Sequence, residues 1–388
     1  MKKIILIFPL AVWIILFLFE ISSFFMQQPK PMYFRAWEYV LNQGKDSFYV
    51  PFQPRAFYDG PMTGDLLFTT NFLPNKSEVR RQIFRTDEYG FRNEVGTYKK
   101  GVDVVLMGTS FVGGAAETQS NLVSSIMNNE YKVKTYNYAT LPLQHFWEDS
   151  RFIKTPPKYL VVIANETEAL QNIWTEFVKP TTLSRRLDSW SSNAEWKKKE
   201  SIVDFSYVGV AALLKRFSII KYELRQKYLA TLNFVLPRNI IASKLIKLNI
   251  YDPDLDMLFW DSNSYNPVAN KKAVDETITT LKNTQEILKS RNITLIMAVM
   301  VSKTTLYSKE YRNLDPKRQS LYLLEKEMEK NGIQHVKLLN IMKNQKELLY
   351  TKDDGHWNSL ANSIIAAELS KKIIELESAK DESNYEAN

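Results

Sequence analysis

The chain has 388 residues, of which 45% are hydrophobic, 24% charged and 13% aromatic, a composition typical of a globular protein that buries one large core or two smaller ones. The net charge of +8 suits an anionic partner such as a polyanionic glycan or a lipid surface, but the mixture of signs does not indicate nucleic acid. With no cysteine in the chain, disulfides, thiolate catalysis and cysteine metal sites are excluded.

The N-terminal residues have the pattern of an uncleaved membrane anchor. Lys2 and Lys3 precede an apolar segment at 4–26 that contains the single charge of Glu20. A segment of this length can span a bilayer when tilted, and the lysines predict that the first three residues are cytoplasmic. No good cleavage site follows. We therefore expect a single-pass protein of the cell membrane, with a proline-containing stalk at 27–83 and a C-terminal domain outside the cytoplasm.

Residues 84–376 alternate between apolar runs and helical patterns, which predicts an α/β domain. Nearly continuous apolar runs are typical of parallel strands buried on both faces, and helical segments between them imply βαβ crossovers. A polar tail follows at 377–388. The predicted strands are residues 102–107, 132–137, 158–164, 293–301 and 334–339, and the predicted helices are residues 119–128, 271–289, 316–330 and 357–376, with a further helix through Phe146 and Phe152.

Residues 169–268 interrupt this alternation. The segment contains polar stretches and one amphipathic helical pattern at 213–228 with basic flanks. We interpret it as a mainly helical insertion or cap. Its basic flanks predict either a solvated helix face or a contact with a membrane surface or a glycan.

Ser110 follows the first predicted strand on a turn bounded by glycines. An open α/β sheet places its reactive groups at the carboxyl ends of its strands. The turn also leaves backbone N–H groups that suit an anion or an oxyanion. Ser110 is thus a candidate nucleophile, and the alternative is a glycine-rich loop that only cradles a phosphate.

A nucleophilic serine needs a base, and that base needs a third group to orient it. Of the three histidines, His335 lies in an apolar predicted strand and His145 has no acid immediately before it. His356 follows Asp353 and Asp354 on a loop that opens a helix, as a base held by a carboxylate requires. The alternative is a structural Asp-Gly turn that caps the helix.

The order and spacing of several motifs resemble the SGNH (GDSL-type) hydrolase family. Gly108-Thr-Ser-Phe111 is similar to the first block, with Thr109 in place of the usual aspartate. Asn165, at the end of the third predicted strand, resembles the asparagine of the third block, and Asp353-Asp-Gly-His356 resembles the last block. The second-block glycine is replaced by Ala139 or Thr140.

Other segments look most like membrane-anchored bacterial members of this family. They are the lead-in Thr86-Asp-Glu-Tyr-Gly-Phe-Arg-Asn93 and the ending Asp354-Gly-His-Trp-Asn358. Ser302-Lys303 through Tyr307 is similar to a segment of the alginate O-acetyltransferase-like branch. The resemblance covers residues 84–168 and 270–376.

The resemblance implies a flavodoxin-like parallel sheet (the SGNH hydrolase fold) and a site without a metal or organic cofactor. The orienting aspartate lies three residues before the histidine in ordinary hydrolases and two before it in the alginate-acetylation branch, and we favour the second spacing. The implied catalytic residues are Ser110, His356 and either Asp354 or Asp353, and the implied oxyanion donors are Ser110, Asn165 and a backbone N–H of Ala139 or Thr140.

The resemblance implies O-acetyl transfer to, or removal from, a cell-surface polysaccharide through an acyl-Ser110 intermediate. The expected partner is a multipass membrane acyltransferase that supplies the acetyl group. A carbohydrate esterase or lipase-like hydrolase is an alternative enzyme. From a different class, the domain could be a non-catalytic SGNH-like scaffold or a glycan-binding subunit of an export or modification complex.

Overall fold

The structure, a computed structural model, describes residues 51–66, 78–171, 268–308 and 313–386, together with positions 37, 40, 251, 252, 255, 257–259 and 311. Within these residues no helix is both long and apolar enough to cross a membrane. The predicted anchor at 4–26 and the amphipathic helix predicted at 213–228 lie outside the described residues.

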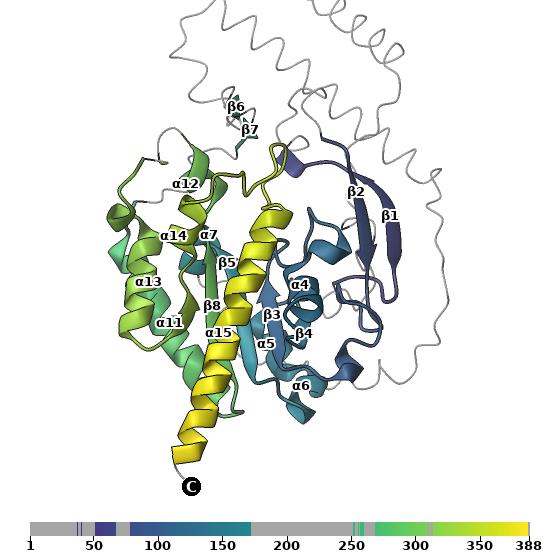
Figure 1. Ribbon diagram of the computed structural model, residues 1–388, viewed down its shortest axis with the longest axis vertical. Coiled ribbons are helices and arrows are strands. Elements are labelled where there is room, and N and C mark those ends of the chain that lie inside the picture. The colour runs from purple at the N-terminus through teal and green to yellow at the C-terminus, as the bar shows by residue number, and fades with distance from the viewer. Residues whose placement is uncertain are drawn as a thin grey trace, which may run out of the picture.

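Five parallel strands form the central sheet (Figure 1). Their spatial order is β4-β3-β5-β8-β9, which is the 2-1-3-4-5 order of flavodoxin-like folds. Every residue of β3 is buried, as its continuous apolar run predicts. The predicted α/β fold with a parallel sheet is therefore confirmed. The strands are β3 (Val104–Gly108), β4 (Thr135–Asn137), β5 (Tyr159–Asn165), β8 (Thr294–Met300) and β9 (Gln334–Val336).

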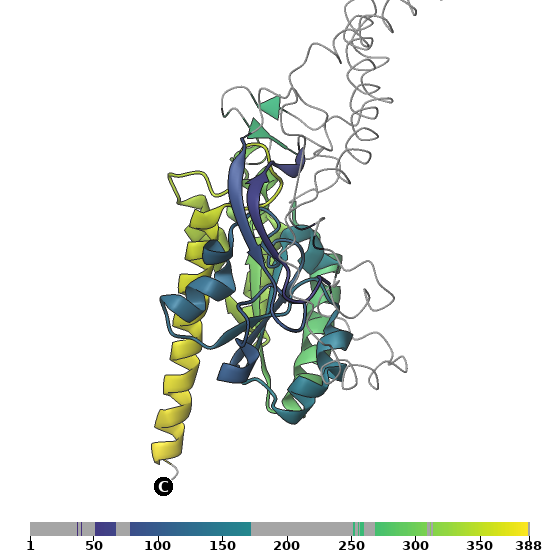
Figure 2. The ribbon, with the colours of Figure 1, turned by 90° about the vertical axis from the view of Figure 1, so that its right-hand side faces the viewer.

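Helices cover both faces of this sheet. Figure 2 shows α4 (Val123–Asn129) and α15 (Ser359–Glu386) on one face and α11 (Lys271–Lys289) on the other. The bounds of α11 are those predicted from its period, because Asn270 caps its first turn by accepting from the Ala273 N–H. The shorter helices are α5 (Leu143–Glu148), α6 (Ser150–Lys154), α7 (Glu166–Leu170), α12 (Lys303–Tyr307), α13 (Ser320–Lys330) and α14 (Leu338–Lys343).

Several predicted boundaries differ from the observed ones. The predicted helix at 119–128 is a 3-10 turn, Gln119–Asn121, followed by α4, and the predicted strand at 334–339 ends at Val336 because α14 begins at Leu338. The predicted helix at 316–330 likewise starts with a 3-10 turn before α13. Helix α15 continues to Glu386 through most of the predicted polar tail, so this tail is helical.

The predicted irregular stalk at 27–83 is wrong for its last part. There β1 (Phe57–Met62) pairs antiparallel with β2 (Arg80–Arg85), and Pro61 is tolerated because β1 has one strand partner among the described residues. Gln82 Nε2 on β2 donates to the carbonyl oxygens of Ala115 and Glu117. The strand pair is thus fastened to the segment that follows Ser110, and it belongs to the α/β domain.

Few residues of the predicted insertion at 169–268 are described. It comprises the end of α7 and the two short antiparallel strands β6 (Tyr251–Asp252) and β7 (Met257–Leu258). The predicted mainly helical character of residues 169–268 lies outside the described residues.

Candidate active site

A continuous chain of hydrogen bonds joins three of the predicted site residues. Ser110 Oγ lies 2.7 Å from His356 Nε2, and His356 Nδ1 lies 2.7 Å from Asp354 Oδ1. Ser110 follows β3, whereas Asp354 and His356 lie on the loop before α15. In the tautomer with the proton on Nδ1, the ring donates to Asp354 and accepts from the serine hydroxyl, which is the arrangement of a serine nucleophile with an oriented base.

The turn that carries Ser110 is fixed by close packing at Gly108. This glycine has φ 153°, and a Cβ there would lie 2.2 Å from the carbonyl oxygen of Ile163 on the neighbouring strand. The turn is then closed by the Ala115 N–H, which donates to the Ser110 carbonyl, and by Asn137 Nδ2, which donates to the Val112 carbonyl. Ser110 is therefore held at the carboxyl end of β3, at the switch point between β3 and β5.

The segment Thr86–Asn93, which the sequence singled out by resemblance without assigning it a role, supports this turn. The Arg92 guanidinium donates to the carbonyl oxygens of Gly113 and Gly114. Asn93 exchanges two hydrogen bonds with the backbone of Asn137 on β4. Arg92 and Asn93 are almost fully buried, so these contacts act as a fixed base for the nucleophile turn.

The two candidate aspartates have different partners. Asp354 Oδ1 accepts hydrogen bonds from the ring and from the backbone N–H of His356. Asp353 Oδ2 instead accepts from the backbone N–H groups of Gly64 and Glu78, and burial raises the pKa of this carboxyl. Of the two residues that the sequence left open, the structure brings Asp354 to the histidine.

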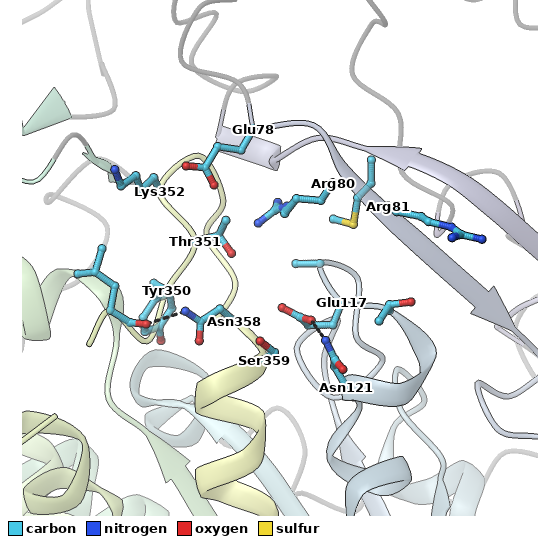
Figure 3. A pocket seen from close by; sticks show the side chains of 14 residues that line it. Glu78, Arg80, Arg81, Glu117, Asn121, Tyr350, Thr351, Lys352, Asn358 and Ser359 are labelled. Carbon is cyan, nitrogen blue, oxygen red and sulfur yellow. Dashed lines mark hydrogen bonds between the residues drawn. The ribbon is translucent and has the colours of Figure 1, made fainter. Parts of the chain in front are cut away.

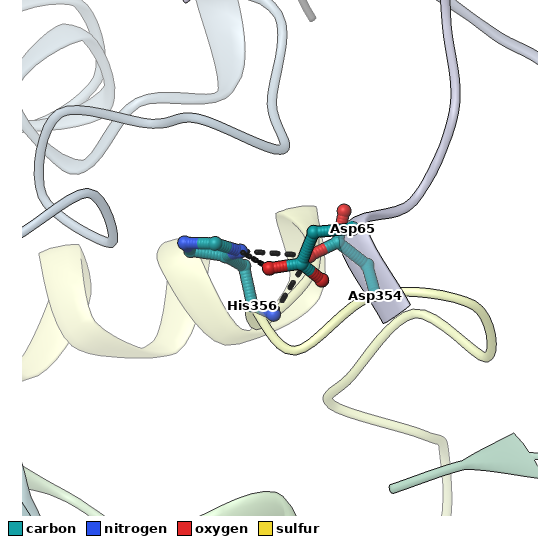
Figure 4. Close-up of side chains that lie close together, drawn as sticks. All are labelled: Asp65, Asp354 and His356. Atoms are coloured by element: carbon teal, nitrogen blue, oxygen red, sulfur yellow. Dashed lines mark hydrogen bonds and ion pairs between the residues drawn. The ribbon is translucent and has the colours of Figure 1, made fainter. Parts of the chain in front are cut away.

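A third carboxylate, Asp65, reaches the same histidine. Asp65 Oδ1 accepts from the Gly355 N–H at 2.7 Å, and its Oδ2 lies 3.6 Å from His356 Nδ1 (Figure 4). Sequence reasoning missed this residue because it lies in the proline-containing segment that was predicted to be a stalk. No motif or period marks it there, and only the fold places it beside a loop almost three hundred residues away in the chain.

Two of the predicted oxyanion donors remain available. Asn165 caps α7: its Oδ1 accepts from the Glu168 N–H at 3.0 Å, which turns its Nδ2 away from that helix. Among the described residues neither this Nδ2 nor the backbone N–H of Ser110 has a hydrogen-bond acceptor. Both residues are half-buried at the carboxyl ends of adjacent strands, where donors for a developing negative charge belong.

The predicted second-block donors have other partners. The Ala139 N–H donates to Asn137 Oδ1 at 3.0 Å, and the Thr140 N–H donates to the Gly108 carbonyl at 2.8 Å. Thr140 has a positive φ of 77°, which a β-branched residue rarely adopts. In this structure the Thr140 amide therefore joins the ends of β3 and β4, the Ala139 amide bonds to the last residue of β4, and neither is directed to an oxyanion.

Lys303 secures the loop that carries the acid and the base. Its side chain is buried, and Nζ donates to the carbonyl oxygens of Thr351 at 2.6 Å, Lys352 at 3.2 Å and Asp354 at 2.8 Å. Burial lowers the pKa of this ammonium to about 7, against the pull of nearby Asp354. The sequence singled out the segment 302–307 by resemblance but gave no reason for the lysine.

Aromatic packing shields one side of the base. The Phe111 ring packs on His356, with 4.5 Å between centroids, and on Trp357, with 4.4 Å. The other two histidines lie elsewhere: His145 is buried on α5, where burial lowers its pKa, and His335 Nδ1 bonds to the Ile333 carbonyl. His356 is thus the histidine that reaches Ser110.

A polar pocket of about 420 Å³ lies on the acid side of the site (Figure 3). Arg80 lines it, and Arg80 Nη2 lies 3.5 Å from both Asp353 Oδ1 and Asp354 Oδ2. The residues Glu117, Asn121, Tyr350 and Ser359 also contribute to its wall. Neither Ser110 nor His356 lines this pocket.

The donor atoms of Asp65, Asp354 and His356 lie within 4.8 Å of one another, a spacing that could hold a metal ion. A metal on Nδ1 would have to replace the proton that Asp354 accepts in the hydrogen-bond chain to Ser110. The three groups fit the orientation of a base, and we assign no metal to them.

Comparison with known families agrees with this geometry. Residues 256–387 match the family model described as the SGNH hydrolase-like domain of the acetyltransferase AlgX. This part of the chain is therefore similar to an SGNH hydrolase-like domain. The match includes Lys303, Asp354 and His356 but begins after Ser110 and Asn165, so the assignment of the nucleophile rests on the distances given above.

Solved structures with a similar arrangement are distant. A GDSL-like lipase from Bacteroides thetaiotaomicron is 14% identical, with a TM-score of 0.33 and with 72% of this chain and 90% of that chain covered. A lipolytic protein of the G-D-S-L family from Desulfitobacterium hafniense is 8% identical, with the same TM-score and with 70% and 99% covered. No curated protein sequence matches the chain.

Proposed function

We propose that this SGNH hydrolase-like domain transfers an acetyl group through an ester on Ser110, to or from the hydroxyl groups of a cell-surface polysaccharide. The observation that carries the proposal is the hydrogen-bond chain from Ser110 through His356 to Asp354, with both distances at 2.7 Å. A serine at this distance from an oriented imidazole can be deprotonated as it attacks.

The reaction follows from the positions of the groups. Ser110 Oγ attacks the carbonyl carbon of the acetyl donor while His356 Nε2 takes the hydroxyl proton. The oxyanion that forms accepts hydrogen bonds from the Ser110 N–H and from Asn165 Nδ2. His356 then gives the proton to the departing oxygen, the bond between the acyl carbon and that oxygen breaks, and acetyl-Ser110 remains.

The second half repeats these steps with a new acceptor. A sugar hydroxyl, or water, loses its proton to His356 Nε2 as it attacks the acyl carbon of acetyl-Ser110. The bond between that carbon and Ser110 Oγ then breaks, the histidine returns the proton to Oγ, and the acetylated sugar or acetate leaves. Asp354 stabilises the imidazolium in both halves without itself taking the proton. The same residues therefore serve transfer and hydrolysis, and the acceptor that occupies the site decides between them.

Three observations support the polysaccharide and envelope part of the proposal. The matched family model is described as an acetyltransferase domain, the chain carries a net charge of +8, and residues 4–26 have the composition of a membrane anchor. An anchored, basic acetyltransferase outside the cytoplasm would meet an anionic glycan there. As the resemblance to the alginate-acetylation branch implies, it would receive acetyl groups from a multipass membrane acyltransferase.

The test compares two acceptors with one donor. The full-length chain is given an aryl acetate, with and without an acidic oligosaccharide, and both released acetate and acetylated sugar are measured. The proposal predicts acetylated sugar that disappears in Ser110→Ala, whereas acetate release alone would make the chain an esterase. If Ser110→Ala matches the unaltered chain in both products, the serine mechanism is wrong and a non-catalytic scaffold becomes the better account.

A further inference from the structure

We propose that Asp65 is a second acid of the catalytic base, a positioning residue that acts on His356 together with Asp354. The inference rests on the proposed serine mechanism and extends it to a residue from the N-terminal strand pair. Asp65 lies beyond the end of β1, far in the chain from the loop that holds the histidine.

Asp65 makes two distinct contacts with this loop. Its Oδ1 accepts from the Gly355 N–H at 2.7 Å, which fixes the backbone between Asp354 and His356. Its Oδ2 lies 3.6 Å from His356 Nδ1, too far for a strong hydrogen bond but close enough for a charge contact. The single Nδ1 proton therefore faces two carboxylates, with Asp354 as the nearer one.

Asp353 joins the backbone around Asp65 to the loop that carries Asp354 and His356. Asp353 Oδ2 accepts from the Gly64 N–H, and the Asp353 carbonyl accepts from the Leu66 N–H. A Cβ on Gly64 would lie 2.0 Å from that same carbonyl oxygen, so the two segments approach as closely as glycine allows. The two adjacent aspartates thus have different roles. Asp354 bonds directly to the histidine, and Asp353 bonds to the segment that carries Asp65.

Two basic side chains lie beside this cluster of carboxylates. Lys303 Nζ lies under the loop, bonded to the Asp354 carbonyl, and Arg80 Nη2 lies 3.5 Å from Asp353 and Asp354. Imidazolium formation at His356 during acyl transfer places a positive charge beside Asp65 and Asp354, so the second carboxylate stabilises the charged form of the base when it appears.

The test removes the charge of Asp65 but keeps its shape. Asp65→Asn retains an oxygen that can accept from the Gly355 N–H. It should lower kcat for an aryl acetate about tenfold or more while KM stays within about twofold. The reason is that the lost carboxylate charge stabilises the imidazolium of the transition state and not the neutral imidazole that is present when substrate binds. Asp65→Glu should recover part of the loss. Asp59→Asn is the matched control, because Asp59 lies on β1 in an exposed pair with Arg81, and it should leave kcat unchanged.

A double variant separates a shared role from an independent one. If Asp65 supports the histidine when Asp354 is neutralised, Asp65→Asn combined with Asp354→Asn should lose more activity than the product of the two single losses. A kcat for Asp65→Asn within about twofold of the unaltered chain, or a loss confined to KM, would overturn the proposal.

A readout without turnover distinguishes this inference from the proposed function. The proton resonance of His356 Nδ1–H, assigned from its loss in His356→Gln, should move in Asp65→Asn and stay in place in Asp59→Asn. If the resonance moves but the chain shows no Ser110-dependent turnover, the serine mechanism fails while the contact stands. If the resonance does not move, the assignment of Asp65 is wrong whatever the activity.

Discussion

Lys303 Nζ donates a hydrogen bond of 2.8 Å to the carbonyl oxygen of Asp354, the residue whose side chain orients the catalytic base. A buried ammonium therefore holds the backbone of the acid while the carboxylate of the same residue holds the histidine. This relationship joins α12, which follows β8, to the loop that opens α15.

Replacing Lys303 by Met should loosen this loop and change how stability depends on pH. In the folded chain the pKa of the Lys303 ammonium is about 7, below its ordinary value of 10.5. Between these two pH values the unfolded chain therefore binds more protons than the folded chain, and the contribution of Lys303 to stability rises with pH. The difference in unfolding free energy between the unaltered chain and Lys303→Met should therefore grow from about pH 7 to about pH 10. Urea titrations at several pH values measure it, and a difference that shrinks over this range would contradict the assignment.

The two aspartates before His356 should respond differently to the same change. Asp354→Asn preserves shape but favours the wrong histidine tautomer, and it should lower kcat by about a hundredfold or more. Asp353→Asn keeps an oxygen for the Gly64 and Glu78 N–H groups, and kcat should stay within about threefold of the unaltered value. Steady-state kinetics with an aryl acetate compares them. Equal losses, or a larger loss in Asp353→Asn, would show that the wrong residue was assigned.

Asn165 has two roles that one substitution can separate. Asn165→Ser retains an oxygen that caps α7 but removes the amide donor, so kcat should fall about a hundredfold, the scale of one lost oxyanion donor, while thermal stability changes little. Asn270→Ser makes the same change at the cap of α11 and should leave kcat unaltered. If the two variants have the same kcat, Asn165 is only a helix cap.

Glu325 on α13 offers a test of the fold that does not involve the site. Burial raises the pKa of its carboxyl to about 7, against an ordinary value of 4.5. Between these two pH values the folded chain keeps a proton that the unfolded chain releases. The contribution of Glu325 to stability therefore falls as the pH rises from about 4.5 to about 7.

Glu325→Gln should therefore stabilise the chain at about pH 8, by on the order of 1–3 kcal/mol, and have little effect at about pH 4. Glu329→Gln is the control, because Glu329 is exposed on the same helix and pairs with Lys337 at 2.9 Å, and it should not stabilise at either pH. Denaturant unfolding gives both differences. A destabilised Glu325→Gln at the higher pH would mean that the buried carboxyl is ionised and well paired.

The sequence was informative wherever function depends on local pattern. Apolar runs located the strands of the sheet, and the blocks around Ser110, Asn165 and His356 located three groups that the fold brings to one edge. These predictions succeed because a buried parallel strand has a distinctive composition and because the ends of such strands meet at one edge.

The missing parts of the site depend on contacts between distant segments. Asp65 lies among prolines with no period, and it reaches the histidine only because β1 pairs with β2 and Asp353 clasps the following residues. Likewise, the choice between Asp353 and Asp354 is a matter of side-chain direction on one loop. The Ala139 and Thr140 amides could be assigned other partners only once the strand ends were placed.

The most direct test of the serine mechanism is the mass of the full-length chain after brief exposure to para-nitrophenyl acetate and rapid acid quenching. The mechanism predicts a population heavier by one acetyl group, with the modification mapped to the peptide that contains Ser110, and no such modification of that peptide in Ser110→Ala. His356→Ala should also lack it under the same exposure, because the serine then has no base. An acetyl group that maps to other residues only, or that appears equally in Ser110→Ala, would contradict the account.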